Sequence, residues 1–336
     1  MPKASSPERE DSSNGSPPAS TAVEGEASEP AVPTAGEEPT PAPAPKPPSL
    51  VDIIEKGDER EVAKRLRVEV ERVIKRFSAN IGDYCLLSLY EPEDSIEQWD
   101  LNRIYGALEA TNPKHEKNVF LLLVSPGGEI EPAYQIAKIC KAFARERFVV
   151  AVPRSAKSAA TLLALGADQI HMGILGQLGP IDPQLGNLPA LGVQRALETI
   201  ASICEKSPGG SEMFAKYLSS TVTIEQIGYC QRVAESAVQY AEILLTNKGE
   251  VGQKAREVAS FLVHGYKDHS FVIDIQEARS HLGEPWIIGE SPEINFAERL
   301  YRLLDQTNVF LRLFQKKRMA LVGGLLGDCV IWPNRS

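Results

Sequence analysis

The stretch Leu121-Leu122-Leu123-Val124-Ser125-Pro126-Gly127-Gly128 decides the fold of this chain. Its apolar half continues a run that starts at Val119, and an apolar run without alternation is typical of a strand buried on both faces. The glycine pair that follows can adopt positive φ and exposes bare backbone N–H groups at the end of that strand. We therefore expect a central strand over 119–124 whose end carries a loop able to approach a ligand closely.

Apolar runs and helical patterns alternate through the centre of the chain. Further strands are expected over 84–89, 148–152 and 169–172, with helices over 131–147 and 158–165 between them. Buried strands that alternate with helices indicate a mostly parallel sheet covered on both faces, which is the α/β class. Because such sheets place ligands at the carboxyl ends of their strands, the loops 125–128 and 153–157 should lie at one edge.

The flanks of this centre are predicted to be helical. A single amphipathic helix is expected over 51–77, another helix over 95–110, and mostly helical structure from 189 to about 263. The segment 296–319 also has an amphipathic face, suited to covering a core or a neighbouring subunit. We therefore divide the chain into a tail of 1–48, a domain of 49–290 and a C-terminal helical extension of 291–336.

The first 48 residues differ from the rest in composition. They hold 12 of the 24 prolines, with eight acidic and three basic residues, and contain no Leu, Ile or aromatic residue. Such a segment cannot bury enough apolar surface to offset the entropy lost on ordering, so we expect it to be disordered.

Composition also limits the partners and the compartment. The net charge of −9, without a basic patch in the sequence, argues against nucleic acid as a partner. No apolar run is long enough to span a membrane, and the N-terminus lacks a signal-peptide core, so we expect a cytoplasmic protein. The five cysteines form no CxxC pair and no Gly-x-Gly-x-x-Gly follows a strand, so neither a metal nor a nucleotide cofactor is expected.

Ser158 opens a predicted helix of small and apolar residues, about thirty residues after the glycine pair. A hydroxyl at the positive end of a helix, near a loop with free N–H groups, is the minimum arrangement for acyl transfer. Each motif also has a plain structural interpretation. Pro-Gly-Gly is a common turn, and either Ser158 or Ser155 could be an ordinary N-cap.

Taken together, the two motifs resemble those of the Clp-protease proteolytic subunit and signal peptide peptidase A class, whose spiral of ββα units is shared with crotonases. That class carries Ser-Pro-Gly-Gly, then a nucleophile about ten residues before Ala-Asp, as Ser158 stands before Ala167-Asp168 here. The segments KSAATLLALGAD (157–168) and LGPIDPQ (178–184) are typical of the serine dehydrogenase proteinase group. The resemblance covers about residues 50–290 and implies a ClpP/crotonase-like α/β fold.

The resemblance also implies roles for residues of the two motifs. Ser158 aligns with the nucleophile of the class. The N–H groups of Gly128, or less favourably Gly127, and of Ala159 align with the donors that hold the oxyanion.

The general base is where this chain departs from the class. The Clp subunit has a histidine about 25 residues after its serine, and Asp182 stands at that position here. His269 falls near the position of the family's aspartate, so the acid and the imidazole are exchanged. If His269 is the base and Asp182 orients it, the logic of a triad is preserved.

A Ser–Lys dyad is the alternative arrangement, since signal peptide peptidase A uses lysine as its base. Lys157 is adjacent to Ser158, and neighbours on a helix do not face each other, so Lys206 is the better-placed lysine. Such a lysine needs burial to lower its pKa toward neutrality.

These resemblances imply a serine endopeptidase that forms an acyl-enzyme on Ser158 and takes a peptide or protein substrate. They also imply homo-oligomeric rings, with 194–245 as a plausible interface, and an ATPase or membrane protein as a possible partner. Two other functions stay open. The missing histidine at position 182 favours an inactive Clp-like scaffold or peptide-binding assembly protein, while the serine turn argues against crotonase-type acyl-thioester chemistry.

Overall fold

The computed structural model describes residues 48–182, 184–185, 188–221 and 223–334. The chain divides into two units, Met1–Pro47 and Pro48–Ser336. The predicted disorder of 1–48 falls almost entirely outside the described residues. Among the described residues, no helix is both long and apolar enough to cross a membrane.

A seven-stranded sheet forms the centre of the second unit, and the predicted α/β class is confirmed. Five strands run parallel and two, β10 and β11, are antiparallel additions at one edge. In spatial order the strands are β11 (Val330–Pro333), β10 (Lys317–Gly324), β1 (Tyr84–Tyr90), β2 (Asn118–Val124), β3 (Phe148–Val152), β5 (Gln169–Met172) and β9 (Ile287–Ile288). The strand β2 is central, with Leu121 between Leu87 of β1 and Val150 of β3.

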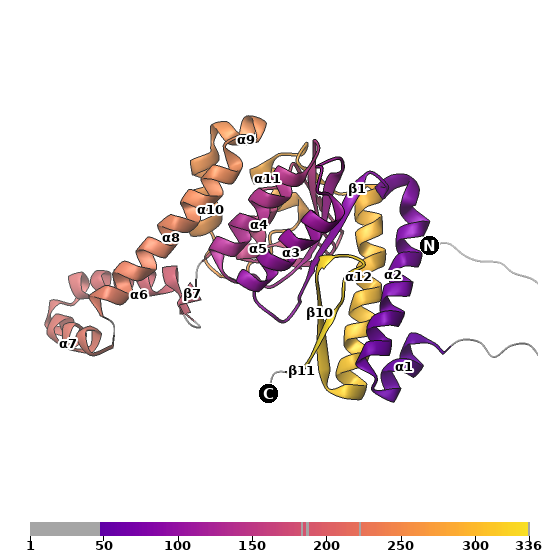
Figure 1. Cartoon of the computed structure of the whole chain (residues 1–336). Coiled ribbons are helices and arrows are strands. Elements are labelled where there is room, and N and C mark those ends of the chain that lie inside the picture. The colour runs from indigo at the N-terminus through magenta and orange to yellow at the C-terminus, as the bar shows by residue number, and fades with distance from the viewer. Residues whose placement is uncertain (1–47, 183, 186–187, 222, 335–336) are drawn as a thin grey trace, which may run out of the picture. The chain divides into compact units, whose positions relative to one another are not determined.

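The side chains of β2 alternate between the two faces of the sheet and are buried on both, so each face has a core that a layer of helices covers. Val119, Leu121 and Leu123 point into one core, and Phe120 and Leu122 into the other. The first core is closed by α3 (Gln98–Thr111), α4 (Ile130–Phe143), α5 (Ala159–Leu165), α8 (Ile224–Leu245), α10 (Ala255–His264) and α11 (Ile275–Leu282). The second is closed by α1 (Leu50–Lys56), α2 (Glu59–Ile81) and α12 (Pro292–Phe310), as Figure 1 shows.

A second, shorter row of strand pairs follows the carboxyl ends of the main strands. It comprises the bridge between Ile96 and Gly128, the bridge between Ser125 and Ala156, and the pair of β4 (Ser155–Ala156) with β6 (Gln177–Leu178). Each main strand from β1 to β3 is thus followed by a second-row segment and then a helix. This repeat is the predicted spiral of ββα units, and it places both sequence motifs in the second row.

Two predicted helical segments differ from the structure. The helix expected over 51–77 is two helices, because Gly57 takes the left-handed conformation (φ 81°) and the Asp58 carboxylate caps α2. The segment 291–336 is not a helical extension. After α12 and a short π-helical turn (Leu311–Gln315), β10 and β11 join the main sheet beside β1, where their apolar residues complete both cores.

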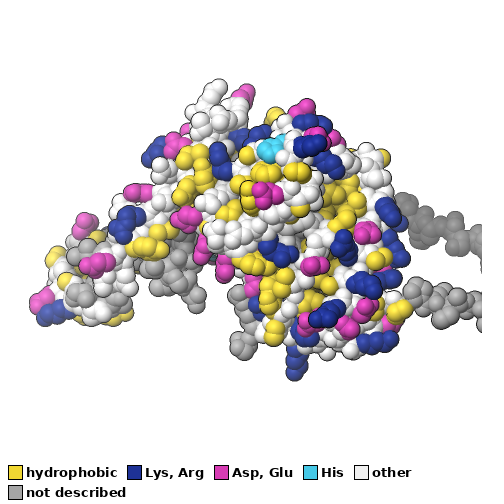
Figure 2. Space-filling view, viewed as in Figure 1, with side chains coloured by type: hydrophobic (Ala, Val, Ile, Leu, Met, Phe, Trp, Pro, Cys, Tyr) yellow, Lys and Arg dark blue, Asp and Glu magenta, His cyan; other side chains and the backbone are white. Residues whose placement is uncertain are grey.

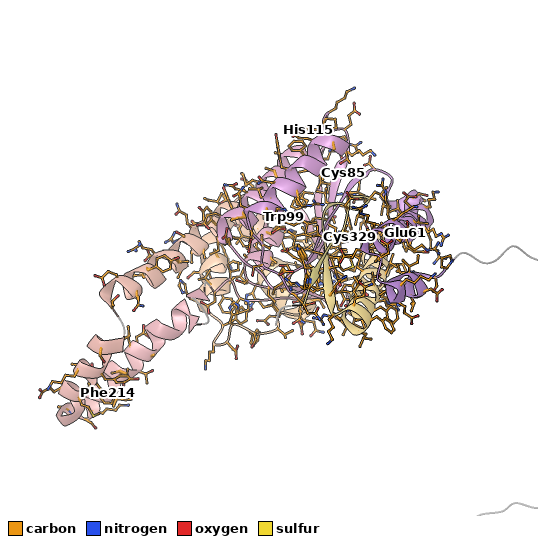
Figure 3. All side chains as sticks on the ribbon, turned by 60° about the horizontal axis from the view of Figure 1, so that its bottom comes forward. Glu61, Cys85, Trp99, His115, Phe214 and Cys329 are labelled. Carbon is orange, nitrogen blue, oxygen red and sulfur yellow. The ribbon has the colours of Figure 1, made fainter. Side chains whose placement is uncertain are left out.

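The predicted helical region after residue 189 is present in the described residues. It contains α6 (Ala190–Lys206), the 3-10 turn Pro208–Gly210, α7 (Ser211–Thr221), α8, α9 (Gly249–Gln253) and α10. The first three of these project from the sheet, and Phe214 lies at their far end in Figure 3. The helix α8 returns from this projection to the core, where its second half packs on α10 and α5.

Candidate functional site

Ser158 occupies a strained turn between β4 and α5. Its backbone has φ 50° and ψ −119°, a conformation that costs a non-glycine residue about 1–3 kcal/mol. Although Ser158 stands at the N-cap position, its side chain makes no capping hydrogen bond. The hydroxyl is therefore free of the structural role that an ordinary N-cap serine fills. A strained strand-to-helix turn that presents a serine is the geometry of a nucleophile elbow.

The glycine loop, residues 125–128, packs directly against this turn. A Cβ built on Gly127 (φ 111°) would lie 2.7 Å from the Cβ of Ser158, 2.8 Å from the Lys157 carbonyl oxygen and 3.2 Å from the Ala159 nitrogen. Only glycine fits this approach without displacing the serine. The glycine pair is thus more than a common turn between a strand and a helix.

Hydrogen bonds orient the two glycine amides differently. The Gly127 N–H donates to the Ser125 hydroxyl (3.2 Å), so it is already occupied. The Gly127 carbonyl accepts from the Ile96 N–H (2.8 Å), and the Glu129 N–H donates to the Ile96 carbonyl (2.9 Å). Since C=O and N–H point opposite ways across a trans peptide, the Gly128 N–H points away from Ile96. This amide is available to a ligand in the adjacent pocket.

A buried acidic pair lies beneath the glycine loop. Glu91, at the end of β1, is 3% exposed, and its carboxyl oxygen lies 3.5 Å from the Ser125 hydroxyl. Burial, then the nearby Asp100 and Asp94, raises the pKa of Glu91 to about 9. Burial also raises the pKa of Asp100 to about 6. The residue under Ser125 is therefore a neutral carboxylic acid at pH 7.

His269 and Asp182 come together, although 87 residues separate them in the sequence. The His269 Nδ1 atom lies 3.9 Å from a carboxylate oxygen of Asp182, whose side chain is 9% exposed. His269 also lines the same pocket as Ser158. With Nδ1 toward the carboxylate, the Nε2 atom is on the opposite side of the ring.

The Lys157 side chain is held by two backbone carbonyl groups. Its ammonium donates to the carbonyl oxygens of Leu178 (2.9 Å) and Phe271 (3.1 Å). Burial lowers the pKa of Lys157 to about 8. Because Phe271 stands two residues after His269, the hydrogen bond from Lys157 connects the segment that carries His269 to the turn that carries Ser158.

The pocket around Ser158 has a volume of about 900 Å³. One wall consists of the glycine loop and the start of α4, with the carboxylates of Glu129 and Glu131. The opposite wall comes from α8 and carries Tyr229, Arg232, Val233 and Ser236. This pocket is large enough for a peptide segment and is open to solvent, since Arg232 and Tyr229 are exposed.

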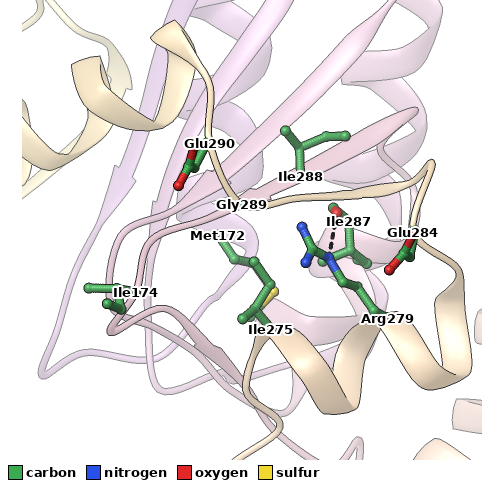
Figure 4. Close-up of a pocket in the computed structure, with 9 residues that line it drawn as sticks. All are labelled: Met172, Ile174, Ile275, Arg279, Glu284, Ile287, Ile288, Gly289 and Glu290. Atoms are coloured by element: carbon green, nitrogen blue, oxygen red, sulfur yellow. Dashed lines mark hydrogen bonds between the residues drawn. The ribbon is translucent and has the colours of Figure 1, made fainter.

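The structure does not bring Lys206 into this pocket. Lys206 is exposed in the last turn of α6 and is absent from the residues that line the pocket. A separate pocket near β9 and α11 is shown in Figure 4, where the Arg279 guanidinium donates to the Ile287 carbonyl (3.2 Å). Its lining residues include no serine, cysteine, histidine or lysine, so it lacks the hydroxyl and the base expected for acyl transfer on a serine.

Some site residues have no signal in the sequence. Ile96 holds the glycine loop through its backbone alone, so its side-chain type gives no indication of that contact. Glu91 follows a buried strand, and an acid directly after an apolar run was the available signal for a site residue at the sheet edge. The contribution of α8 could not be expected, because a helix so distant in sequence is placed only by the tertiary fold.

The model of one protein family matches most of the chain. It is described as "ClpP-like SDH-type serine proteinase" and matches residues 60–308. Two uncharacterized proteins of Methanocaldococcus jannaschii are also similar. MJ0137 is 31% identical over 209 residues, and MJ1495 is 27% identical over 207 residues. Each match covers 61% of this chain, and 63% and 62% of the respective relatives, so the chain spans less than two thirds of their length.

Among solved structures, similarity is found to a membrane-bound stomatin-specific protease in complex with a substrate peptide. It is 14% identical, with a TM-score of 0.40, and covers 74% of this chain and 86% of that one. The Clp protease subunit ClpP1 from Listeria monocytogenes is likewise 14% identical, with a TM-score of 0.39, covering 67% of this chain and 98% of that one. The family match is the decisive finding, and the chain belongs to the ClpP-like SDH-type serine proteinase family.

Proposed function

We propose that this protein is a serine peptidase that cleaves peptide bonds through an acyl-enzyme on Ser158. The observation that carries the proposal is the strained turn of Ser158, whose hydroxyl makes no capping bond and lines one pocket with His269. In this account the Ser158 Oγ attacks the peptide carbonyl carbon. His269 takes the hydroxyl proton through Nε2 and later donates it to the leaving amine.

Asp182 acts on the other nitrogen of that ring. Its carboxylate faces His269 Nδ1 at 3.9 Å and would stabilise the imidazolium that forms when the proton is taken up. The distance is longer than a hydrogen bond. Catalytic hydrogen bonds of a free enzyme commonly tighten only when substrate is bound.

Two backbone amides are proposed to hold the oxyanion. The Gly128 N–H points away from Ile96, and the Ala159 N–H follows the nucleophile directly. Donors fixed before the reaction stabilise the charge of the tetrahedral intermediate without a reorganisation cost. Gly127 serves the same site by its lack of a side chain, not by its N–H, which Ser125 already accepts.

We extend the proposal to a homo-oligomer with the projecting helices as its interface. Large apolar side chains are exposed there, with Ile203, Met213 and Tyr217 at 42%, 64% and 63%. Exposed apolar groups on one projection are expected to be covered by a partner copy. Size-exclusion chromatography with light scattering tests this, and a monomer at every concentration would contradict it.

A fluorophosphonate probe tests the catalytic proposal, because it phosphonylates a serine whose hydroxyl is activated as a nucleophile. The intact protein is labelled as wild type, Ser158→Ala, His269→Ala and Lys206→Ala, and the labelled residue is mapped by mass spectrometry. We expect labelling at Ser158 that is abolished in Ser158→Ala, strongly slowed in His269→Ala and unchanged in Lys206→Ala. Ser280→Ala and His281→Ala, on α11 outside the pocket, are the matched controls.

Other outcomes separate the remaining functions. Labelling that survives His269→Ala but not Lys206→Ala would identify the lysine dyad and exclude the exchanged triad. A folded oligomer that takes no label at any pH would instead support the inactive scaffold or peptide-binding protein. The distance between Nδ1 and Asp182 is the observation that keeps this second function in view.

A further inference from the structure

A groove between α2 and α12 collects four arginines. Its lining residues, one helical turn apart on each helix, are Glu69, Arg72, Val73 and Arg76 of α2 and Arg299, Arg302, Leu303 and Gln306 of α12. The groove has a volume of about 380 Å³, and Val73, 9% exposed, contributes to its apolar floor. Figure 2 shows Lys and Arg side chains predominating along the edge of the unit that α2 forms.

The acid that lines this groove is already shared by two arginines. A carboxylate oxygen of Glu69 lies 2.7 Å from Arg72 and 2.8 Å from Arg65. Glu69 therefore cannot neutralise the remaining guanidinium groups. The lining side chains keep a net positive charge, in a chain whose total charge is −9.

The acids of α12 near the groove are engaged elsewhere. Glu298 lies 2.7 Å from Arg154, and Asp305 accepts a hydrogen bond from Tyr301 (3.1 Å). Within the described part of the chain, no carboxylate forms an ion pair with the other three arginines of the groove, Arg76, Arg299 and Arg302. Like charges on two facing helices repel, so their convergence is unfavourable unless an anion occupies the space between them.

We propose that this α2–α12 groove binds a multiply phosphorylated anion. Guanidinium groups form paired, charge-assisted hydrogen bonds with phosphate oxygens, and arginines on two helices can grip one ligand from both sides. Gln306 adds an amide donor at the rim. A phospholipid headgroup and a soluble phosphorylated metabolite share this chemistry, and the experiment below distinguishes them.

This site is independent of the proposed peptidase. None of its lining residues is among those that line the Ser158 pocket. The sequence gives no signal for this site, because the chain is acidic overall and the four arginines come from two segments more than 200 residues apart. Loss of anion binding would therefore leave fluorophosphonate labelling unchanged, and loss of labelling would leave anion binding unchanged.

Calorimetric titration of the full chain with inositol hexakisphosphate, at physiological salt, tests the proposal. We expect saturable binding that weakens about tenfold or more in Arg76→Gln/Arg302→Gln, since each lost guanidinium removes a charged hydrogen bond. The control is Lys64→Gln/Arg67→Gln, which removes the same charge from α2 outside the groove. This control should change the affinity less than twofold.

Two further readouts complete the test. Without ligand, the groove variant should melt at an equal or higher temperature than wild type, because like-charge repulsion is relieved, so misfolding cannot explain lost binding. Flotation with phosphatidylcholine vesicles, with and without phosphatidylinositol bisphosphate, identifies the source. If wild type floats only with vesicles that contain the phosphorylated lipid, and the groove variant does not float, the ligand is a lipid headgroup. If wild type does not float but binds inositol hexakisphosphate in solution, the ligand is a soluble metabolite. No binding at millimolar ligand, or equal loss in the control, would overturn the proposal.

Discussion

Replacing Gly127 by alanine should slow the chemistry at Ser158 while leaving the protein folded. The new Cβ would lie 2.7 Å from the Ser158 Cβ and 2.8 Å from the Lys157 carbonyl oxygen. Ordinary carbon contacts are about 3.5–4.0 Å, so the loop and the serine must separate by about 1 Å. A misplacement of about 1 Å can cost about 100-fold in rate. The positive φ of 111° adds about 1–3 kcal/mol of backbone strain.

The assay is the rate of fluorophosphonate labelling at Ser158, measured beside the free energy of unfolding in urea. We expect labelling about 100-fold slower than wild type and a loss of about 1–3 kcal/mol in stability. Gly106→Ala is the control, because Gly106 is exposed in α3 and a Cβ there meets nothing within 4 Å. It should raise stability by about 0.5–1 kcal/mol and leave labelling unchanged. Labelling of the Gly127 variant at the wild-type rate would refute the close approach of loop and nucleophile.

Three further predictions follow from the same geometry. Ser158→Gly should abolish labelling yet stabilise the protein by about 1 kcal/mol in urea, because glycine relieves the strain at φ 50°; a clear loss of stability would contradict this. The folded-state pKa of Glu91 is raised to about 9, so its contribution to stability is full below pH 4.5 and is lost as pH rises through 9. Glu91→Gln should therefore gain stability relative to wild type as pH rises across that window, and a constant difference would count against a buried neutral acid. Lys157→Met should remove both hydrogen bonds to the Leu178 and Phe271 carbonyls and slow labelling about tenfold or more, without moving the labelled site. Burial lowers the pKa of Lys157 to about 8, so the free energy of unfolding of wild type should rise as pH rises from 8 to 10.5. The variant should lack this gain.

Most of the central fold could be predicted because its signals are local. The run 119–124 is apolar at every position, and such a short run is typical of a strand buried on both faces. The helix break at Gly57 was missed because the apolar spacing continues across it. The strands of 317–333 were missed for a different reason. The strand β10 pairs with the edge of β1, 231 or more residues earlier in the chain, and such long-range pairing leaves no local pattern. The strand β11 joins the sheet only through its pairing with β10.

In the candidate site, too, the features with local sequence signals could be predicted and those that depend on long-range contacts could not. The glycine loop and Ser158 could be identified because both motifs are contiguous and carry backbone requirements of their own. The pairing of His269 with Asp182 was inferred only through the family resemblance, and the structure places the two 3.9 Å apart. The wall from α8 and the Ile96 contact depend on long-range packing, so no motif could have revealed them.

Chemical rescue of His269→Ala is the most direct test of the central claim. His269 is 30% exposed beside a solvent-open pocket, so free imidazole can reach the space that the variant leaves. The rate of fluorophosphonate labelling at Ser158 is measured in this variant with and without imidazole, across neutral pH. We predict slow labelling that imidazole accelerates at Ser158, and no acceleration in Asp182→Ala, where the ring is still present. Labelling of His269→Ala at the full wild-type rate without imidazole would contradict His269 as the base.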